Sequence, residues 1–538
     1  MSTLNSQLTT VYGQCTRRFM ITYINSNNTA LLVKDDFKEV EPMPIKTGNQ
    51  YIERIDRQKI NIWYKGTRVE GPLSKHPAFQ GLIQTQAEMY NMQCDERYLA
   101  QMTYPSPDTG DPVGLSFLPP KNAEDLERRR KMIELWSNRH HGFLGRSPDY
   151  MNTAIMSLFT AADILEDHNP KYAENLRKYY AFCRDHDITL SHAFIQPQAS
   201  KISGQIDATE DSIAAKVVEI NDQGMFVTGA FMMATQGATC DEMLVFPTPS
   251  PSLVDDDNPF AFAFAVPNDL PGMTFFCRES YAASSTYDHP LSSRYEEMDT
   301  LVIFDRVLIP HDRIFYYGDE RYCSRLFGES NFHTHMAHQI ITRYIAKTEF
   351  FLGMLESLAE EQNAVLEAYT ILPISRILTY LETFKALRLA AEIGASLDKF
   401  GYLVPDKGPL LASTIHFSEF YPEMVEMVQN LSSSGLIMIP SEADFTSSAG
   451  SYLYEYLKGN ISDAWYRNAL FRLAWELGAG AFGGRQTQFE RLFFGNSQTV
   501  AWRMYNSYDN HEYFRQIVHE FIAPDAHLSK STTDGISN

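Results

Sequence analysis

Arg146, Tyr150 and His192 are the side chains of this sequence best suited to chemistry on a small oxygen-containing molecule. Ser147 and Pro148 stand where a helix N-cap and a first helical turn are expected, so a helix is predicted to begin here. Arg146 and Tyr150 are four residues apart and would project from one side of that helix. His192 lies at the end of a predicted strand, beside a polar run that Pro interrupts. Together, a fixed cation, a phenol and an imidazole could bind and polarise a substrate oxygen atom.

Ordinary structural roles explain the same three residues. The arginine could cap a helix, the tyrosine could lie in a core, and the histidine could end a strand. Residue types and spacing alone favour this second interpretation, and both remain open at this point.

The composition indicates a globular protein of two or three domains. The chain has 538 residues, of which 44% are hydrophobic and 21% charged, and its formal net charge is −21. This charge argues against nucleic acid or an anionic membrane as the main partner. No apolar run approaches the roughly 20 residues of a membrane span, residues 1–12 lack the apolar core of a signal peptide, and six scattered cysteines indicate reduced thiols. A cytoplasmic location is expected.

The order of predicted elements is helix, strand, helix, which indicates the α+β class. The first part should contain a short hairpin at 61–69 with Lys65-Gly66 at its turn, a helix at 122–139, and helix from 150 to about 186 with a break near Pro170. Strands should follow at 216–220, 225–230, 260–266 and 300–308, and long helices at 349–366, 377–397, 417–431 and 461–477, which suggest a bundle. The expected domains are 1–188 (helical), 189–316 (β) and 317–523 (helical bundle), with a mobile tail at 524–538.

Three further motifs have simpler explanations. The GxGxxG run at 478–483 follows a helical pattern instead of a strand, so a helix end is favoured over a dinucleotide site. His333, His335 and His338 lack a completing carboxylate or Cys and are interpreted as a cluster at a helix start, with no metal. Glu296-Glu297 and Asp299 are expected in a solvated or salt-bridged turn, with Arg294 as a candidate partner.

The chain resembles the oxygenase component of 4-hydroxyphenylacetate 3-monooxygenase and its relatives that hydroxylate phenol, chlorophenols and nitrophenols. Short segments in the family's order, spread over nearly the whole chain, carry the likeness. They are His76-Pro77-Ala78-Phe79, Gly145 to Tyr150, His192 to Gln198, His289 to Tyr295, Ser434 to Ile437 with Pro440-Ser441, Phe482 to Arg485, and Phe494-Gly495-Asn496.

This resemblance implies an acyl-CoA-dehydrogenase-like fold with a helical N-terminal domain, a central β-barrel and a C-terminal helical bundle. It implies an enzyme of aromatic-compound catabolism, an FADH2-dependent monooxygenase that forms a C4a-hydroperoxyflavin with O2 and hydroxylates a phenol ortho, or para with loss of a group. A separate NAD(P)H:flavin reductase would supply the reduced FAD by diffusion. The family's usual assembly is a homotetramer or homodimer.

The resemblance also assigns site residues by position. Arg146, Tyr150 and His192 would hold the phenolic oxygen, and Thr248 would lie near the loop that grips the far end of the substrate. The flavin contacts would be His192, Ala193, Phe194, Gln198, Ala199, Ser200, Lys201, Thr235, Phe493, Phe494, Gly495 and Asn496. His289, a second candidate base, is balanced against a histidine packed in a Pro turn.

The phenol must react as its anion, although a free phenol has a pKa of about 10. Arg146 can stabilise a phenolate, His192 can hydrogen-bond it or accept its proton, and Tyr150 can orient it. No Lys or Arg lies between Thr235 and Pro267, which favours a neutral or hydroxyl-bound substrate over one with an acidic tail.

Two alternatives remain. One is a lyase resembling 4-hydroxybutyryl-CoA dehydratase, which needs closely spaced cysteines for an iron–sulfur cluster. The other is a non-catalytic scaffold.

Overall fold

Helices form the first and last parts of the chain, and strands form most of the middle. The computed structural model describes residues 44–197, 199, 201–202, 205–206, 212–246, 258–508 and 510–522. Gln198, Ser200, Thr248 and the tail at 524–538 lie outside these residues, as does the side chain of Lys201. Among the described residues, no helix is both long and apolar enough to cross a membrane.

The N-terminal elements follow the sequence patterns. The predicted hairpin forms between β1 (Ile62–Tyr64) and β2 (Thr67–Arg68), with Lys65 and Gly66 at φ 49° and 79°. The break at Pro170 separates two helices, as predicted. The helices are α1 (Gly48–Arg57), α2 (Gln80–Cys94), α3 (Leu99–Met102), α4 (Ala123–Arg139), α5 (Pro148–Thr160) and α6 (Pro170–Asp185), and β3 (Thr103–Pro105) pairs with β4 (Pro112–Gly114).

The described middle strands form two sheets, and the expected β-barrel is not confirmed. The larger sheet has the order β2-β1-β12-β13-β9-β8, and the smaller has the order β14-β11-β10-β5. A closed barrel needs a continuous ladder, and between the two sheets the described residues form only isolated bridges, such as Ile195 with Met233 of β9. The strands are β5 (Leu190–Ala193), β6 (Lys201–Ile202), β7 (Gln205–Ile206), β8 (Lys216–Asn221), β9 (Gly224–Thr235), β10 (Glu242–Val245), β11 (Asn258–Pro267), β12 (Met273–Cys277), β13 (Asp299–Pro310) and β14 (Ile314–Gly318).

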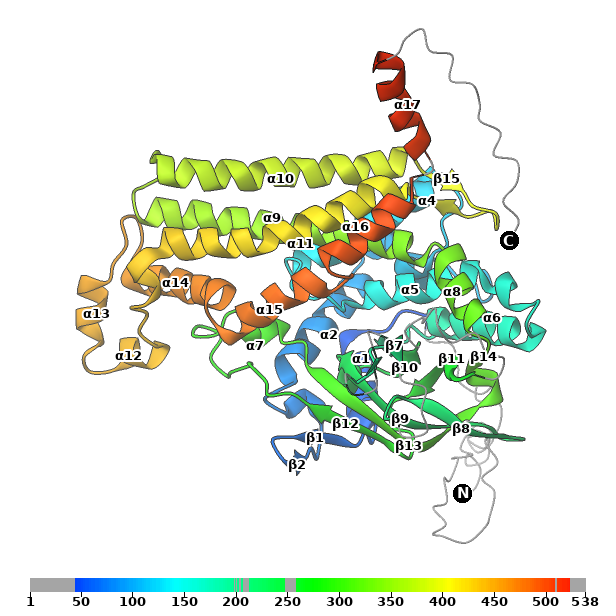
Figure 1. Cartoon of the computed structure of the whole chain (residues 1–538). Helices are drawn as coiled ribbons and strands as arrows, with labels where there is room; N and C mark the ends of the chain where they lie inside the picture. Colours follow the sequence, from blue (N-terminus) through cyan, green and yellow to red (C-terminus); the bar gives the residue numbers. More distant parts are fainter. Residues whose placement is uncertain are drawn as a thin grey trace, which may run out of the picture. The chain divides into compact units, whose positions relative to one another are not determined.

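The C-terminal helices form the predicted bundle. Helices α9, α10 and α11 run side by side along the top of Figure 1, and α14 to α16 pass beneath them. The helix predicted from residue 349 begins earlier, at Phe332. The elements are α7 (Ser292–Tyr295), α8 (Glu320–Glu329), α9 (Phe332–Glu361), α10 (Ala368–Ile393), β15 (Ser396–Leu397), β16 (Leu403–Val404), α11 (Lys407–Ser432), α12 (Glu442–Thr446), α13 (Gly450–Tyr456), α14 (Ala464–Gly478), α15 (Ala481–Leu492), α16 (Ser497–Asn506) and α17 (His511–Ile522).

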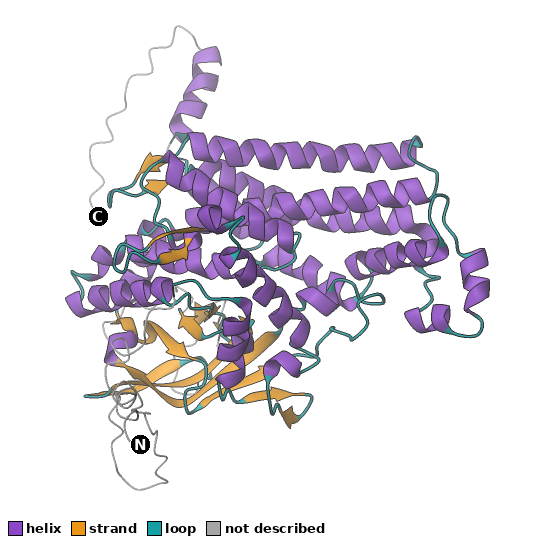
Figure 2. Ribbon diagram, turned by 180° about the vertical axis from the view of Figure 1, so that it is seen from behind, coloured by secondary structure: helices purple, strands orange, loops and turns teal. Residues whose placement is uncertain are grey.

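Helix α5 connects the two halves of the structure. Of its thirteen residues, only Phe159 is not buried, because α6 and β5 pack on one side and α9 packs on the other. Seen from behind in Figure 2, the strands form a layer below the helices. The described residues all belong to one compact unit, 41–538, so the division into domains stays a prediction.

Candidate active site

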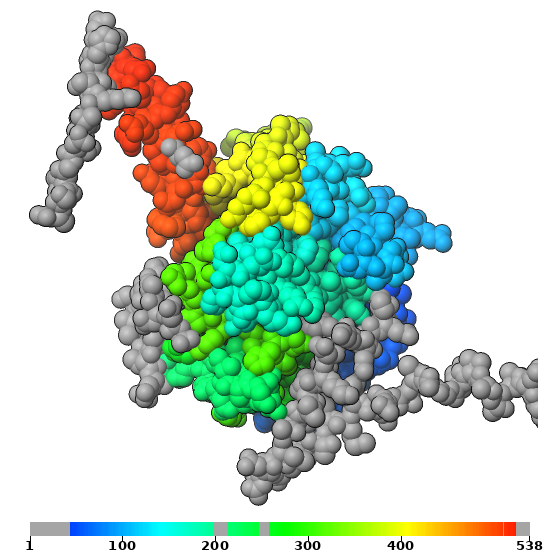
Figure 3. All heavy atoms as spheres, turned by 90° about the vertical axis from the view of Figure 1, so that its right-hand side faces the viewer, coloured from blue at the N-terminus to red at the C-terminus, as the bar shows by residue number. Residues whose placement is uncertain are grey.

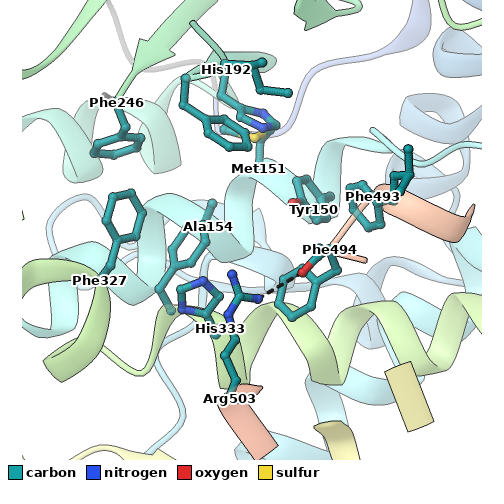
Figure 4. A pocket seen from close by; sticks show the side chains of 15 residues that line it. Tyr150, Met151, Ala154, His192, Phe246, Phe327, His333, Phe493, Phe494 and Arg503 are labelled. Carbon is teal, nitrogen blue, oxygen red and sulfur yellow. Dashed lines mark hydrogen bonds between the residues drawn. The ribbon is translucent and has the colours of Figure 1, made fainter. Parts of the chain in front are cut away.

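A cavity of about 350 Å3 lies where α5, β5, α9 and the segment after α15 meet. Its wall is almost entirely aromatic and aliphatic, and Figure 4 shows the side chains that line it. The lining residues are Tyr150, Met151, Ala154, His192, Phe194, Ile195, Phe246, Phe327, Phe332, His333, Leu492, Phe493, Phe494, Gly495 and Arg503.

Arg146 stands next to this cavity just before α5. Pro148 is in the first turn of the helix, as predicted, and the backbone N–H of Arg146 donates to Glu297 Oε1 at 2.6 Å. The guanidinium carbon lies 4.7 Å from the ring centre of Tyr150 and 4.6 Å from that of Phe493, both of which line the cavity. Cation–π contacts of this kind stabilise a desolvated cation.

The positive charge of Arg146 has no carboxylate partner among the described residues. Its only side-chain hydrogen bond to them runs from Nη1 to the carbonyl of Gly145 at 3.3 Å, and its buried Nε has no hydrogen-bond partner there. A half-buried cation without a carboxylate partner favours an incoming anion.

His192 lies on β5, where its backbone is paired with Leu244 of β10. The imidazole is 6.1 Å from the Tyr150 ring and stacks on Phe194 at 5.3 Å, and its buried Nδ1 has no hydrogen-bond partner among the described residues. Burial, and then the charge of Arg146, hold the pKa of His192 well below its usual range. Burial raises the pKa of Tyr150. Both groups are therefore neutral at pH 7, beside a permanent cation.

The structure brings several of the predicted flavin residues to the cavity but not all of them. His192, Phe194, Phe493, Phe494 and Gly495 line it. Of the others, Ala193 is buried in β5, Ala199 is exposed, Lys201 is in β6, Asn496 caps α16, and the Thr235 hydroxyl donates to Asp299 Oδ1 at 2.7 Å.

His289 is not among the residues that line this cavity. Its Nδ1 is 3.3 Å from Oε1 of Glu476 on α14, and 41% of its side chain is exposed. The same glutamate accepts hydrogen bonds from the backbone N–H groups of Leu291 and Ser292. Hydrogen bonding to Glu476 raises the pKa of His289. This placement supports a role in holding the turn before α7, not a role in the cavity.

Glu297 and Asp299 are salt-bridged, as one of the two expectations had it, although Arg294 is not their partner. Both belong to a buried network, in which Arg485 of α15 donates to Glu297 at 3.1 Å and to Asp299 at 2.8 and 3.1 Å. Arg278 also pairs with Asp299, at 2.8 Å. Sequence separations of 186 and 188 residues hid the two pairs made by Arg485. Because Glu297 accepts from the backbone of Arg146, the network holds the start of α5.

Two polar lining residues, His333 and Arg503, were not predicted. Burial, and then Arg503, lower the pKa of His333 to about 3. The histidine motif drew attention to His333 but did not indicate that it lines the cavity. Of the three histidines only His333 does so, whereas His338 bonds Glu392 at 2.9 Å. Nothing in the sequence around Arg503 indicated a site. The GxGxxG run lies at the junction of α14 and α15, as the interpretation of a helix end predicted.

Comparisons with known proteins cover nearly the whole described chain. The family model "4-hydroxyphenylacetate 3-hydroxylase N terminal" matches residues 47–316, and "4-hydroxyphenylacetate 3-hydroxylase C terminal" matches 323–523. A curated relative, the 4-hydroxyphenylacetate 3-monooxygenase oxygenase component of Thermus thermophilus, is 39% identical over 88% of this chain and 96% of its own.

Two solved structures are similar in fold. The crystal structure of such an oxygenase component with FAD and 4-hydroxyphenylacetate is 39% identical, covers 89% of this chain and 98% of its own, and has a TM-score of 0.82. An archaeal 4-hydroxybutyryl-CoA dehydratase from N. maritimus is 20% identical, covers 90% and 96%, and has a TM-score of 0.80. This second likeness concerns the fold alone.

Proposed function

The chain belongs to the 4-hydroxyphenylacetate 3-hydroxylase family, and we propose that it is the oxygenase component of a two-component flavin-dependent monooxygenase that hydroxylates a phenol. The carrying observation is that Arg146, Tyr150 and His192 meet beside one aromatic cavity. The fold expected from the resemblance is confirmed apart from the closed barrel.

The residues around the cavity fit reduced FAD together with a phenol. The flat rings of Phe493 and Phe494 and the stacked pair His192 and Phe194 offer surfaces for aromatic ligands. The orphaned Nδ1 of His192 can hydrogen-bond an oxygen. When bound, reduced FAD reacts with O2 and supplies one oxygen atom to the ring, and the other leaves as water.

Arg146, Tyr150 and His192 would activate the phenol by holding its oxygen as an anion. Arg146 supplies the fixed positive charge that lowers the phenol's pKa, and extra charge flows from that oxygen to the ortho carbon, or to a para carbon that then loses its group. Tyr150 remains an O–H donor because its pKa is raised. Neutral His192 has one N–H to donate, and its low pKa makes it a poor store for the phenol's proton.

The wall of the cavity would keep water from the reacting atoms. Of its fifteen lining residues only Tyr150, His192, His333 and Arg503 carry polar side-chain groups. An apolar environment also strengthens the attraction between Arg146 and a phenolate.

The proposed partners are a flavin reductase and further copies of this chain. A two-component enzyme needs a separate reductase to supply reduced flavin. Self-association is supported by α17, which buries none of its residues. Large apolar side chains on this helix are left 49–87% exposed, namely Tyr513, Phe514, Ile517 and Phe521. An isolated helix this short is marginal in water, and in Figure 3 it stands out from the rest of the molecule. A homodimer or homotetramer would cover these residues.

The lyase alternative is not favoured. Its cluster would need adjacent cysteines, but the described cysteines Cys94, Cys183, Cys240, Cys277 and Cys323 are separate free thiols, and the described residues contain no group of three His, Cys, Asp or Glu that could hold a metal.

The test is to mix the protein anaerobically with reduced FAD, add O2 in a stopped-flow instrument, and follow flavin absorbance and products with and without phenols. We expect the protein to change the time course of flavin oxidation, and one phenol to yield a product with an added hydroxyl group. Flavin oxidation identical to that of free FAD, with no product from any phenol, would contradict the proposal and favour a scaffold.

A further inference from the structure

Arg343 of α9 is a second guanidinium beside the candidate phenol site. Its guanidinium carbon lies 5.7 Å from the ring centre of Phe489 and 5.5 Å from that of Phe493, which lines the cavity. Arg146 packs on the same two rings, at 5.8 and 4.6 Å. The rings stack on each other at 4.6 Å, and Phe493 lies 5.3 Å from Tyr150 (Figure 4). Two arginines therefore share one pair of aromatic rings at the wall of the cavity.

The two arginines differ in their ion pairs. Arg343 binds Glu490 of α15 through both carboxylate oxygens, from Nη1 to Oε1 at 2.5 Å and from Nη2 to Oε2 at 2.9 Å. Lys347, one turn further along α9, donates to the same Oε1, and all three side chains are buried. Despite this burial, the two cations lower the pKa of Glu490 to about 2, so the carboxylate is ionised at pH 7. Arg146 has no such partner among the described residues.

The other carboxylates around Arg146 are also occupied. The charges of Glu297 and Asp299 act on Arg146, yet both side chains pair with Arg485, at 3.1 and 2.8 Å. Asp149, in the first turn of α5, accepts a hydrogen bond from a glutamine side chain of α9 at 2.8 Å, and burial raises its pKa. The charge of Arg146 is left for a ligand because the neighbouring carboxylates already have partners.

Glu490 is the carboxylate that the loss of Arg343 would release. It follows Phe489 in α15, and the Phe489 ring packs so closely on Gly145 that a Cβ on this glycine would lie 2.2 Å from it. Oε2 of Glu490 is bound by Arg343 alone within the described chain. Without Arg343, this buried oxygen would lack a partner beside a cation that has no carboxylate, and an unpaired buried charge is costly. Pairing with Arg146 would remove that cost.

We propose that Arg343 is a positioning residue for the phenol site: by binding Glu490, it keeps this carboxylate from Arg146, whose charge stays available for the phenol's oxygen. The inference rests on the proposed function, because it concerns the cation that would hold the phenolate. Arg343 itself does not line the cavity. It acts through the charge that a bound phenol meets, and that charge sets the pKa of the phenol.

The test follows the ionisation of bound 4-nitrophenol, whose anion is coloured, by absorbance against pH in the full-length protein. Arg343→Met should raise the pKa of the bound probe by about 0.5–1 unit, because Glu490 then competes with the phenolate for Arg146. Arg343→Met combined with Glu490→Gln should bring this pKa back toward the wild-type value, because the competing carboxylate is gone. Glu490→Gln alone should not raise it. Lys347, whose pKa burial already lowers to about 8, can then release its proton.

Arg313 gives a matched control. It is a buried arginine that pairs with Glu242 and packs on two aromatic rings, but it does not line the cavity. Arg313→Met should destabilise the protein and leave the pKa of the bound probe unchanged. Arg343→Lys keeps the positive charge and should hold that pKa near the wild-type value. Should Arg343→Met fail to fold, Arg343→Gln allows the same comparison, with and without Glu490→Gln.

Two outcomes would overturn the inference. One is an unchanged pKa of the bound probe in Arg343→Met. The other is an equal rise in Arg343→Met and in the double variant, which would assign the effect to lost packing or to the charge of Arg343 itself. If Arg146→Met raises the pKa of the bound probe but no Arg343 variant does, only this inference fails. If the wild-type protein neither lowers that pKa nor hydroxylates a phenol, the proposed function fails first.

Discussion

At the scale of single residues, the candidate site combines one unpaired cation with two neutral hydrogen-bonding groups. Arg146 has cation–π contacts to Tyr150 and Phe493 but no carboxylate within the described chain. Burial keeps His192 unprotonated and Tyr150 protonated at neutral pH. The strongest electrostatic term available to a bound phenol is therefore its attraction to Arg146, which favours the anion over the neutral phenol.

Replacing Arg146 should raise the pKa of a bound phenol. 4-Nitrophenol is a suitable probe because its anion is yellow, so its ionisation on the protein can be followed by absorbance as the pH is changed. We expect the wild-type protein to lower the pKa of the bound phenol and Arg146→Met to raise it again by about 1–3 units.

His289→Ala serves as the control in that titration, because His289 lies on Glu476 and not at the cavity. It should bind the probe with the wild-type pKa. An Arg146→Met protein that ionises the probe as readily as the wild type would show that the cation is not directed at the phenol.

Buried histidines should make the protein sensitive to acid. Burial lowers the pKa of His335 to about 3, so between pH 3 and 6.5 the unfolded chain binds a proton that the folded protein does not. Stability from this group is complete above pH 6.5 and falls as the pH drops below it, by about 1.4 kcal/mol per pH unit.

His335→Leu should reduce that slope by the same amount, measured by urea unfolding at several pH values from 7 to 4.5. A core substitution that removes no titrating group, such as Leu355→Val, should lower stability without changing the slope. An unaltered slope in His335→Leu would mean that this histidine becomes protonated without unfolding.

At the scale of elements, the sequence predicted the pieces of the site better than their assembly. The start of α5 could be predicted from Pro148 and from the spacing of Arg146 and Tyr150. The strand with His192 could be predicted because β-branched and aromatic residues become frequent there. These are local signals. Arg503, Phe327 and Arg485 could not be placed, because each reaches the site through contacts between helices and strands far apart in sequence. Local patterns specify which face of an element is apolar, but not which partner covers it.

Arg485 should couple the bundle to the candidate site. It pairs with Glu297, which holds the backbone of Arg146, and with Asp299, which accepts from Thr235. Removing Arg485 takes away positive charge that compensates the two buried carboxylates. The free energy of unfolding should fall by about 3–5 kcal/mol. We expect Arg485→Met to lower the thermal midpoint and to reduce the fraction of oxidised flavin that yields hydroxylated product.

An exposed pair gives the matched control. Arg306 contacts Glu219 with 56% and 39% of the two side chains exposed, so Arg306→Met should cost less than about 1 kcal/mol and leave product yield unchanged. Arg485→Lys should restore stability more than product yield, because one ammonium cannot bind both carboxylates in the same geometry. Normal yield in a destabilised Arg485→Met protein would reduce Arg485 to a purely structural role.

At the scale of the whole molecule, the α+β class and the order of the three parts were predictable because helical and strand periodicities change once each along the chain. The barrel came only from the resemblance, and the two sheets of described strands do not confirm it. Helix α17 is the element that indicates how copies of the chain would assemble. The apolar residues of α17 recur at positions 513, 514, 517, 518, 521 and 522, which is one face of a helix.

Charge on that face should break the assembly. Phe514 and Phe521 are 49% and 87% exposed in one chain, and in an oligomer they would be buried, where a carboxylate is costly. We expect Phe514→Glu with Phe521→Glu to lower the molar mass measured by light scattering, whereas Arg515→Glu, between them in sequence but off the apolar face, should leave the oligomer intact. A wild-type monomer, or a double variant of unchanged mass, would contradict assembly through α17. If the smaller species still binds 4-nitrophenol with the wild-type pKa, the phenol site belongs to one chain, as the contacts of Arg146, Tyr150 and His192 indicate.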